Sequence, residues 1–515
     1  MLASNTVSDA IKEEHWATAV RAKLAQAESF RQAGKIDKAL SICDALLSKY
    51  PKYVGALHTA GLAYADKRDH QNALNHLVRA VMYSPENWRA TTALAAAYLE
   101  VAAPEMAATT LERAAALAPD DLSILALRAM VFHEQRDYVS AAELFATVLA
   151  RDANFSGAAI GHALACIEMG QYAEATASLT PLIARGERSI RVIQLLTRIP
   201  QQIHGLDLRR LTLEAKGTAS HKKGEFETTL AFVKASLAAS EYTVEETWGA
   251  VMAANKLAAA GTETQRRQIN ARQSEALIRL KSSRLRPRPL APVAGLPLSL
   301  FILGSSRSGK TTLESLAGRL QGIQMGYENP IAFKAAQQVL RSAGFPDSGY
   351  AGLPPDLEGP CREIYSAKLR KRAGACRVFT NTDPNLIYDV LSIASIIPNS
   401  RFVFVKRNVY DTVFGILMTL YRFGNEYSYD LKSVWDHVHW YHEMIDVIAS
   451  RLPEISLVTT YEDTITSPKD ILTKVANLCQ LDLVPDNLIE IGNDVGVADS
   501  FRDIIDSSIE SSKHS

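Results

Sequence analysis

Small apolar residues recur at a fixed interval through the first part of the chain. Alanines stand 34 residues apart, at positions Ala39, Ala73, Ala107, Ala141 and Ala175. Prolines keep the same interval at positions 51, 85 and 119, as do small residues at 61, 95, 129 and 163. Small residues let two helices approach closely, and a proline cannot continue a helix. The pattern therefore predicts stacked helix–turn–helix units.

This interval resembles the tetratricopeptide repeat (TPR), which we expect over residues 20–189. Residues 1–19 precede the repeats as a helix or tail. Residues 190–281 keep helical spacing but leave the 34-residue frame, so we expect divergent repeats or capping helices there. Stacked repeats form an α-helical solenoid with a concave groove, in which we expect a protein or peptide partner. A scaffold or dimerisation arm that binds no partner is the alternative.

The pattern changes after a linker at residues 282–297, where the prolines of RPRPLAPVAGLP exclude a continued helix. Apolar runs typical of strands then alternate with helical runs. The strand-like runs cover 299–304, 377–380, 401–407 and 455–461, and the helical runs cover 384–397, 411–423 and 431–452. Such alternation predicts an α/β domain with a parallel sheet covered by helices. We expect this domain over residues 298–500, followed by a C-terminal tail at 501–515.

Composition mainly excludes classes of protein. The 56 Lys and Arg residues balance 56 Asp and Glu residues, so the net charge favours neither nucleic acid nor an anionic membrane as a partner. No apolar run predicts a membrane span or a signal peptide, so we expect a cytoplasmic protein. The five cysteines lack CxxC spacing, and His437, His439 and His442 include no pair four residues apart. Neither a disulfide framework nor a metal site is predicted.

One stretch joins a strand, a glycine-rich turn and a helical run. It reads Gly304-Ser-Ser-Arg-Ser-Gly309-Lys310-Thr311-Thr312. Two glycines let the backbone curl so that successive N–H groups point at an anion, and the following helix adds its positive N-terminal end. In a parallel sheet this loop lies at the carboxyl edge, where ligands bind. The candidate anion-binding residues are Ser306, Arg307, Ser308, Gly309, Lys310, Thr311 and Thr312.

Five segments, in the same order, resemble the sulfotransferases that use 3′-phosphoadenosine 5′-phosphosulfate (PAPS). GSSRSGKTTLE resembles their loop G-x-P-R-S-G-T-T-L-x-E, and Gly326-Tyr-Glu328 stands where they place a general base. Residues 378–415 resemble the segment leading to their 3′-phosphate site, and residues 423–431 and 458–483 resemble later landmarks. Together with the repeats, the chain resembles the TPR sulfotransferases of bacteria.

This resemblance implies a sulfotransferase-like P-loop fold, PAPS as the sulfuryl donor and adenosine 3′,5′-bisphosphate as the product. It implies that the loop, with Arg307, binds the 5′-phosphosulfate. It also implies that Glu328 takes the acceptor proton and that Arg407, at the end of its strand, pairs with the 3′-phosphate. A guanidinium suits that task because it can meet phosphate oxygens bidentately.

The chain departs from the family at three positions that bear on the site. Lys310 stands where the family has threonine, and Thr382 stands where the family has lysine. Lys310 is therefore a candidate for the cation beside the transferring group, and it completes the catalytic set with Glu328 and Arg307. Gly415 replaces a serine that holds the 3′-phosphate in the family.

Three functions follow from these residues. The first is transfer of a sulfuryl group to a hydroxyl or phenol of a peptide tyrosine, a glycan or a lipid. The second is an ATP-dependent kinase, because Lys310 makes GSSRSGKT match G-x-x-x-x-G-K-[ST]; a kinase would also need an acidic Mg²⁺ ligand, for which Asp463 is the candidate. The third is a catalytically silent TPR scaffold. For Arg407 an ion pair with Asp411 is the alternative, and for Glu328 a surface position.

Overall fold

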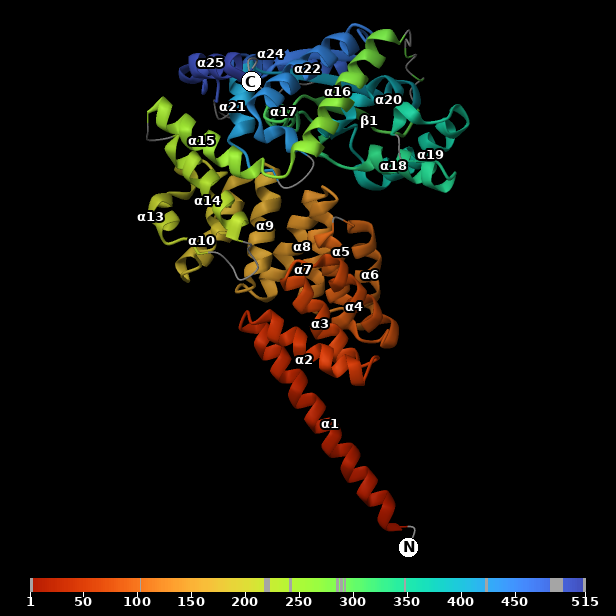
Figure 1. Cartoon of the computed structure of the whole chain (residues 1–515). Helices are drawn as coiled ribbons and strands as arrows, with labels where there is room; N and C mark the ends of the chain where they lie inside the picture. The colour runs from red at the N-terminus through yellow and green to blue at the C-terminus, as the bar shows by residue number, and fades with distance from the viewer. Residues whose placement is uncertain are drawn as a thin grey trace. The chain divides into compact units, whose positions relative to one another are not determined.

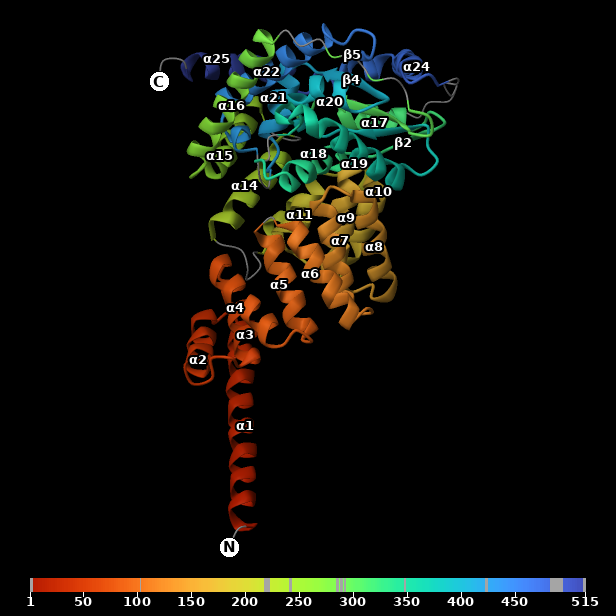
Figure 2. The ribbon, with the colours of Figure 1, turned by 90° about the vertical axis from the view of Figure 1, so that its right-hand side faces the viewer.

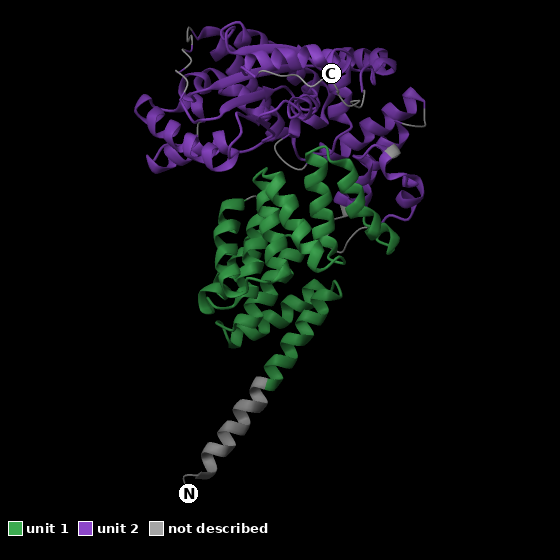
Figure 3. Cartoon of the chain, turned by 180° about the vertical axis from the view of Figure 1, so that it is seen from behind, with its two compact units in different colours: residues 1–189, 216–222 green, residues 190–215, 223–515 purple. Residues whose placement is uncertain are grey.

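The structure is a computed structural model. It describes residues 3–101, 103–216, 223–239, 243–283, 287, 290, 293–346, 349–421, 425–481 and 494–512, with side chains from residue 18 on except at 201, 202 and 223. The described residues divide into two compact units, one within 1–189 and 216–222 and the other within 190–215 and 223–515 (Figure 3). Part of the predicted linker, at 284–286, 288–289 and 291–292, lies outside the described residues.

The first unit is a stack of paired helices (Figure 1). It opens with one continuous helix, α1 (Ala3–Gln32), across the segment predicted as a helix or tail. The pairs that follow keep the 34-residue interval in their starting positions. Their bounds are α2 (Ile36–Lys49), α3 (Val54–Asp66), α4 (His70–Tyr83), α5 (Trp88–Glu100), α6 (Pro104–Leu117), α7 (Leu122–Glu134), α8 (Tyr138–Arg151), α9 (Ser156–Glu168) and α10 (Tyr172–Ala184).

The recurring small residues lie where the helices of this unit touch. All five alanines of the 34-residue frame are 0% exposed. At Gly61 a Cβ atom would come within 2.6 Å of Leu77 Cγ on the neighbouring helix, so nothing larger than glycine fits that crossing. Successive helices lie side by side (Figure 2). The predicted repeat solenoid is confirmed, and its physical basis is this close packing.

Helices from residues 190–282 belong to the second unit. The two that bear on the candidate site are the last ones. Helix α15 packs against α21 (Val409–Leu417), and α16 packs against α22 (Leu431–Ala449). In the second contact Trp440 Nε1 donates to the Gln273 carbonyl over 2.8 Å. The six helices are α11 (Ile190–Thr197), α12 (Gln201–His204), α13 (Leu208–Leu213), α14 (Lys223–Ala238), α15 (Val244–Ala258) and α16 (Glu263–Ser282).

A five-stranded sheet forms the centre of the second unit, and all its pairings are parallel. Its strand order is β2-β3-β1-β4-β5. The four strands expected from the sequence are confirmed, whereas the two-residue strand β2 was not predicted. The strands are β1 (Leu298–Leu303), β2 (Ile323–Gln324), β3 (Val378–Asn381), β4 (Ser400–Lys406) and β5 (Ser456–Thr460).

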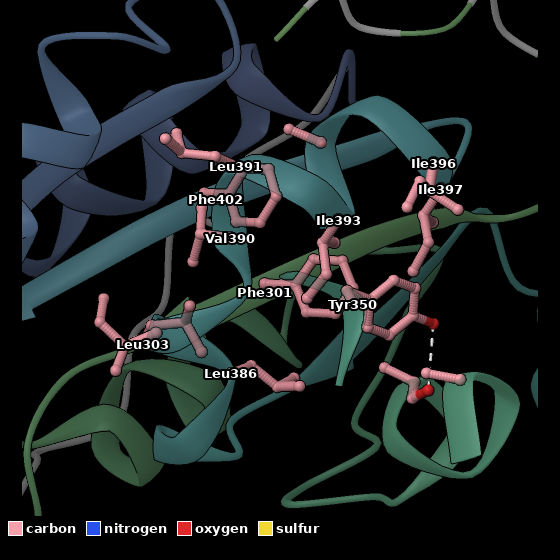
Figure 4. Close-up of a cluster of buried hydrophobic side chains, with 14 of the residues drawn as sticks. Phe301, Leu303, Tyr350, Leu386, Val390, Leu391, Ile393, Ile396, Ile397 and Phe402 are labelled. Atoms are coloured by element: carbon pink, nitrogen blue, oxygen red, sulfur yellow. Dashed lines mark hydrogen bonds between the residues drawn. The ribbon is translucent and has the colours of Figure 1, made fainter. Parts of the chain in front are cut away.

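Alternation along the strands divides the core between the two faces of the sheet. Phe301 and Leu303 point to a cluster that includes α20 and Tyr350, whose hydroxyl donates to the Ala332 carbonyl over 3.0 Å (Figure 4). Leu300 and Ile302 face α17 and α24 on the other side. The covering helices are α17 (Lys310–Ala317), α18 (Ile331–Ser342), α19 (Pro355–Ala373), α20 (Val390–Ile396), α21 (Val409–Leu417), α22 (Leu431–Ala449), α23 (Tyr461–Thr466) and α24 (Pro468–Leu478).

Three segments differ from the sequence expectation. The helical run predicted at 411–423 ends at Leu417, and its residues 422–423 lie outside the described residues. The helical run predicted at 384–397 begins as a 3₁₀ helix, Pro384–Tyr388, before α20. The segment expected as a C-terminal tail contains helix α25 (Arg502–Ser512), whose Ile505 and Ile509 are buried in the cluster around α21. An amphipathic helix of this kind is part of the domain core rather than an appendage. Among the described helices, none is both long and apolar enough to cross a membrane.

The strand order determines where a ligand site can form. Strand β1 is central, β3 lies on one side of it and β4 on the other. In an open parallel sheet, a crevice for ligands forms at the carboxyl edge where the strand order reverses. The loop after β1, the end of β3 and Arg407 after β4 all lie at that edge.

Candidate functional site

The loop after β1 has the geometry of an anion cradle. Gly309 caps α17 with φ 89°, and Arg307 adopts φ 64°, so two residues of the loop lie in the left-handed region. A Cβ atom at Gly304 would lie 2.5 Å from the Val405 carbonyl, and one at Gly309 would lie 2.3 Å from Tyr461 Cδ2. Both glycines are therefore required by close approach, as the curled loop predicted from the sequence demands.

Two serine hydroxyls in this loop are buried without a protein partner. Ser305 Oγ and Ser308 Oγ have no hydrogen-bond partner among the described residues. Buried hydroxyls normally have partners, so two such groups at a helix N-terminus fit a bound anion. Ser306 and Thr312 are half-buried, and Thr311 is exposed. Ser305 was missing from the sequence candidates, although it lies between two of the quoted motif positions.

Lys310 is held by the loop itself. Its side chain is 7% exposed, and Nζ donates to the Ser305 carbonyl over 3.0 Å. Burial, and after it the positive charge of Lys310, lowers the pKa of His437 to about 3, so that imidazole is neutral. His437 stacks on Tyr427, with ring centroids 4.0 Å apart. Lys310 thus has two roles in the loop. It stabilises the loop through its hydrogen bond to the Ser305 carbonyl, and it places a positive charge there.

Arg307 is the exposed cation of the loop, and Gly415 makes room for it. A Cβ atom at Gly415 would lie 3.3 Å from Arg307 Cβ and 3.5 Å from its Nε. Glycine at position 415 therefore lets the arginine side chain pass close to α21. The departure at Gly415 is a packing feature of this loop.

Arg407 is buried behind the loop, and two of its three guanidinium nitrogens donate to backbone carbonyls. It is 8% exposed and lies over the Tyr461 ring, 4.3 Å from the centroid. Nη1 donates to the Arg307 carbonyl over 3.2 Å, and Nη2 donates to the Asp494 carbonyl. The alternative ion pair with Asp411 is present at 3.9 Å, while Nε has no partner among the described residues. Arg407 is positioned by these contacts, and its Nε–H is available for an anion.

Asp411 anchors the segment that follows residue 493. Its carboxylate accepts the backbone N–H groups of Gly496 over 2.8 Å and Ala498 over 2.9 Å. Asp494 N–H donates to the Tyr461 hydroxyl over 3.3 Å. A segment far along the sequence therefore packs on the two residues that flank the predicted 3′-phosphate site. Sequence reasoning had assigned this segment no role in the site.

Glu328, the predicted base, lies in a turn attached to the end of β3. Its neighbour Asn329 is buried, and Asn329 Nδ2 donates to the Thr380 carbonyl over 3.0 Å. Asn381 Nδ2 in turn donates to the Asn329 carbonyl over 2.9 Å. Glu328 itself is half-buried, so it is neither a freely exposed surface residue nor a core residue. The structure brings it to the same strand edge as the loop.

A second carboxyl group belongs to this region, on Glu314 of α17. It is 0% exposed, and its Oε1 accepts the Tyr327 N–H over 2.9 Å and the Thr380 hydroxyl. The pKa of Glu314 is raised to about 7, mainly by burial and to a smaller extent by the charge of Glu328, while the hydrogen bonds from Thr380 and Tyr327 act in the opposite direction. The sequence contained a signal, because Glu314 lies one helical turn after Lys310 and next to the apolar face of α17.

Replacing Glu314 by Gln is expected to change how the free energy of unfolding varies with pH. The folded state keeps the Glu314 proton from pH 4.5 to about 7, where the unfolded chain has lost it. Stability from this group therefore falls as pH rises through that window, by about 3 kcal/mol at most. The variant lacks this loss, so it should gain stability relative to the parent between pH 4.5 and 8.

Urea unfolding of the parent and the variant at pH 4.5 and at pH 8 measures the difference in their free energies of unfolding. Other titrating groups cancel in the comparison because they are common to both proteins. A constant difference between the two proteins across the window would show that Glu314 ionises normally.

Two family models match parts of the chain. Residues 297–486 match the model of the sulfotransferase family, and residues 64–131 and 132–199 match the model of the tetratricopeptide repeat. The chain thus joins a TPR array to a sulfotransferase-family domain, as its sequence resemblance implied. That domain contains the loop, Glu314, Glu328 and Arg407.

Repeat proteins are among the solved structures that are similar to the chain. A TPR protein from Parabacteroides merdae is 17% identical over 42% of this chain and 84% of its own, with a TM-score of 0.36. A thermophilic TPR protein from Thermus thermophilus is 17% identical over 35% of this chain and 98% of its own, with a TM-score of 0.32. MamA is 21% identical over 32% of this chain and 95% of its own, with a TM-score of 0.27. No curated protein matches the chain.

Proposed function

From the sulfotransferase-family domain, we propose that this chain transfers a sulfuryl group from PAPS to a hydroxyl or phenol acceptor. One observation carries the proposal. The anion loop, in which the hydroxyls of Ser305 and Ser308 have no partner within the described part of the chain, shares the carboxyl edge of the sheet with Glu328 and Arg407. A carboxylate and two anion-binding groups at one edge are what such a transfer requires.

Each protein group has a task in this scheme. PAPS, when bound, supplies the activated sulfuryl group and leaves as adenosine 3′,5′-bisphosphate. The loop amides, Arg307 and the hydroxyls of Thr311 and Thr312 hold the 5′-phosphosulfate and stabilise the negative charge that develops on the leaving phosphate. Glu328 accepts the proton of the acceptor hydroxyl. Arg407 offers Nε to the 3′-phosphate.

The loop lysine has a task of its own. Lys310, through its bond to the Ser305 carbonyl, keeps the loop closed and adds a positive charge beside the transferring group. The TPR array, in this proposal, recruits a protein or peptide that is the acceptor or presents it. The acceptor oxygen then belongs to a tyrosine phenol or to another hydroxyl that such a partner brings.

The kinase remains the second candidate because Lys310-Thr311 completes the triphosphatase pattern. Its acidic candidate, Asp463, lies in the first turn of α23, where its N–H binds the Thr460 hydroxyl over 3.0 Å. That carboxylate belongs to the end of β5, two strands away from the loop strand β1. This placement favours the sulfotransferase over the kinase.

Ligand binding separates the three functions. Titration calorimetry and thermal unfolding of the full chain, with adenosine 3′,5′-bisphosphate, with ATP and Mg²⁺, or with neither, are the measurements. We expect binding of the bisphosphate in the micromolar range and a rise in Tm, because the loop and Arg407 contact both phosphates. Stabilisation by ATP and Mg²⁺ alone would contradict the proposal in favour of a kinase. No response to either ligand would indicate a silent scaffold.

A further inference from the structure

A second carboxyl group supports the turn that carries Glu328, and the transfer scheme above does not use it. Glu314 lies on α17, the helix that opens at the anion loop, and its side chain has no exposed surface. Its Oε2 has no partner among the described residues, whereas its Oε1 accepts two hydrogen bonds. Burial of a carboxyl group is costly, so its retention there calls for a reason.

The two bonds to Oε1 meet the turn directly. Tyr327 N–H donates to Glu314 Oε1 over 2.9 Å, one residue before Glu328. The Thr380 hydroxyl donates to the same oxygen and accepts the Gly326 N–H over 2.8 Å. One carboxyl oxygen thus holds two consecutive amides of the turn, the first through a threonine hydroxyl and the second directly.

The turn needs such support because its backbone is strained. Tyr327 has φ 52°, a conformation that residues other than glycine rarely adopt. A Cβ atom at Gly326 would lie 2.2 Å from the Thr380 carbonyl, so the chain approaches β3 as closely as glycine allows. Thr382 N–H fixes the other side by donating to the Tyr327 carbonyl over 2.9 Å. Strain of this kind persists only where the surroundings hold it in place.

We propose that Glu314 is the positioning residue for Glu328. Through Oε1 and the Thr380 hydroxyl it holds residues 326–328 in the left-handed turn that presents the Glu328 carboxylate to the acceptor. The proposal rests on the proposed function for the role of Glu328, but the hold on the turn is a property of the fold alone. The helix that follows the anion loop thereby also fixes the base, so donor site and base share one rigid element.

Three variants test the proposal in the full chain. Glu314→Ala removes both bonds, Thr380→Val removes the hydroxyl link, and Glu314→Gln keeps an acceptor oxygen. We expect kcat to fall about 10- to 100-fold for the first two, since small displacements of a catalytic group are costly, and to recover most of its value in the third. The dissociation constant of adenosine 3′,5′-bisphosphate should stay within about 3-fold. Ser315→Ala, one residue further along α17, is the control.

Two further readouts distinguish positioning from a general loss of structure. In a protein that already carries Glu328→Gln, adding Glu314→Ala should lower kcat by less than about 2-fold. A residue that acts through Glu328 has no further effect once that carboxylate is gone. Amide hydrogen exchange of Tyr327 should be at least about 10-fold faster in Glu314→Ala than in Glu314→Gln, measured well below Tm.

An equal loss of kcat in both backgrounds would overturn the proposal, as would unchanged exchange at Tyr327. If the parent protein transfers no sulfuryl group, the proposed function fails. The exchange experiment still decides whether Glu314 holds the turn.

Discussion

Glu328→Gln is expected to slow sulfuryl transfer by about 100-fold or more at saturating substrates. The amide is nearly the size of the carboxylate but cannot accept a proton from the acceptor. The turn should survive, because its fixed points are the backbone of residues 326 and 327 and the side chain of Asn329. Binding of adenosine 3′,5′-bisphosphate should therefore change less than about 3-fold. Initial rates and calorimetry on one preparation give both quantities.

Glu462→Gln is the matched control for that experiment. Glu462 is also half-buried at the carboxyl edge of the sheet, and its Oε1 accepts the Asn408 N–H over 2.9 Å. Glutamine keeps an acceptor for that amide, so turnover should be unchanged. Wild-type turnover in Glu328→Gln would show that another group takes the proton. A parallel loss of bisphosphate affinity would instead place Glu328 in donor binding.

The repeats could be predicted because their information is local and periodic. The 34-residue interval of the alanines repeats in the helix starts at Ile36, His70, Pro104, Tyr138 and Tyr172. Small residues are needed where paired helices cross, because a Cβ atom at Gly61 would lie 2.6 Å from Leu77 Cγ. The interval between small residues in the sequence is therefore the interval between helix contacts in the structure. The domain boundaries proposed from that period, and the role given to residues 190–281, remain predictions.

The sheet was predictable to the extent that its strands are long. The four longer strands contain apolar or β-branched residues, and three of them, β1, β3 and β4, are mostly buried. Strand β2 is Ile323–Gln324, which is too short to have a period. Helix α25 was missed because DIIDSSIESS has few apolar residues, although Ile505 and Ile509 suffice to bury one face. Short elements of this kind form through contacts with the rest of the domain, which no local window contains.

The site was predictable only where it is continuous in sequence. The loop at 304–312 was found because strand, glycines and helix follow one another. Glu314 was within the quoted motif, but its bond to the Thr380 hydroxyl joins residues 66 positions apart. The contacts of Asp411 with Gly496 and Ala498 span 85 and 87 positions. Such partners can be identified only once the fold brings them together.

Replacing Arg407 is the second change for which we expect a large effect, and the affinities for two adenosine phosphates measure it. Arg407→Ala should weaken the binding of adenosine 3′,5′-bisphosphate by about 100-fold, because it removes the partner of the 3′-phosphate. This is the size expected for a buried charge-assisted hydrogen bond. Adenosine 5′-phosphate lacks the 3′-phosphate, so its affinity should change less than about 5-fold. Arg407→Lys should fall between, since an ammonium keeps the charge but loses the planar fork. Calorimetry with both ligands gives the ratio.

The ratio of the two affinity changes shows whether Arg407 mainly binds the 3′-phosphate or mainly stabilises the loop. Its contacts in the structure are compatible with both roles. Nη1 binds the Arg307 carbonyl and the guanidinium lies over Tyr461, so its loss also removes a brace from the loop. If bracing were its main task, both ligands would weaken equally, because the loop serves the 5′-phosphate of each. Tyr461→Phe is the control, since it keeps the ring and removes only the hydroxyl that accepts the Asp494 N–H. An equal loss for both ligands in Arg407→Ala would place the 3′-phosphate contact elsewhere.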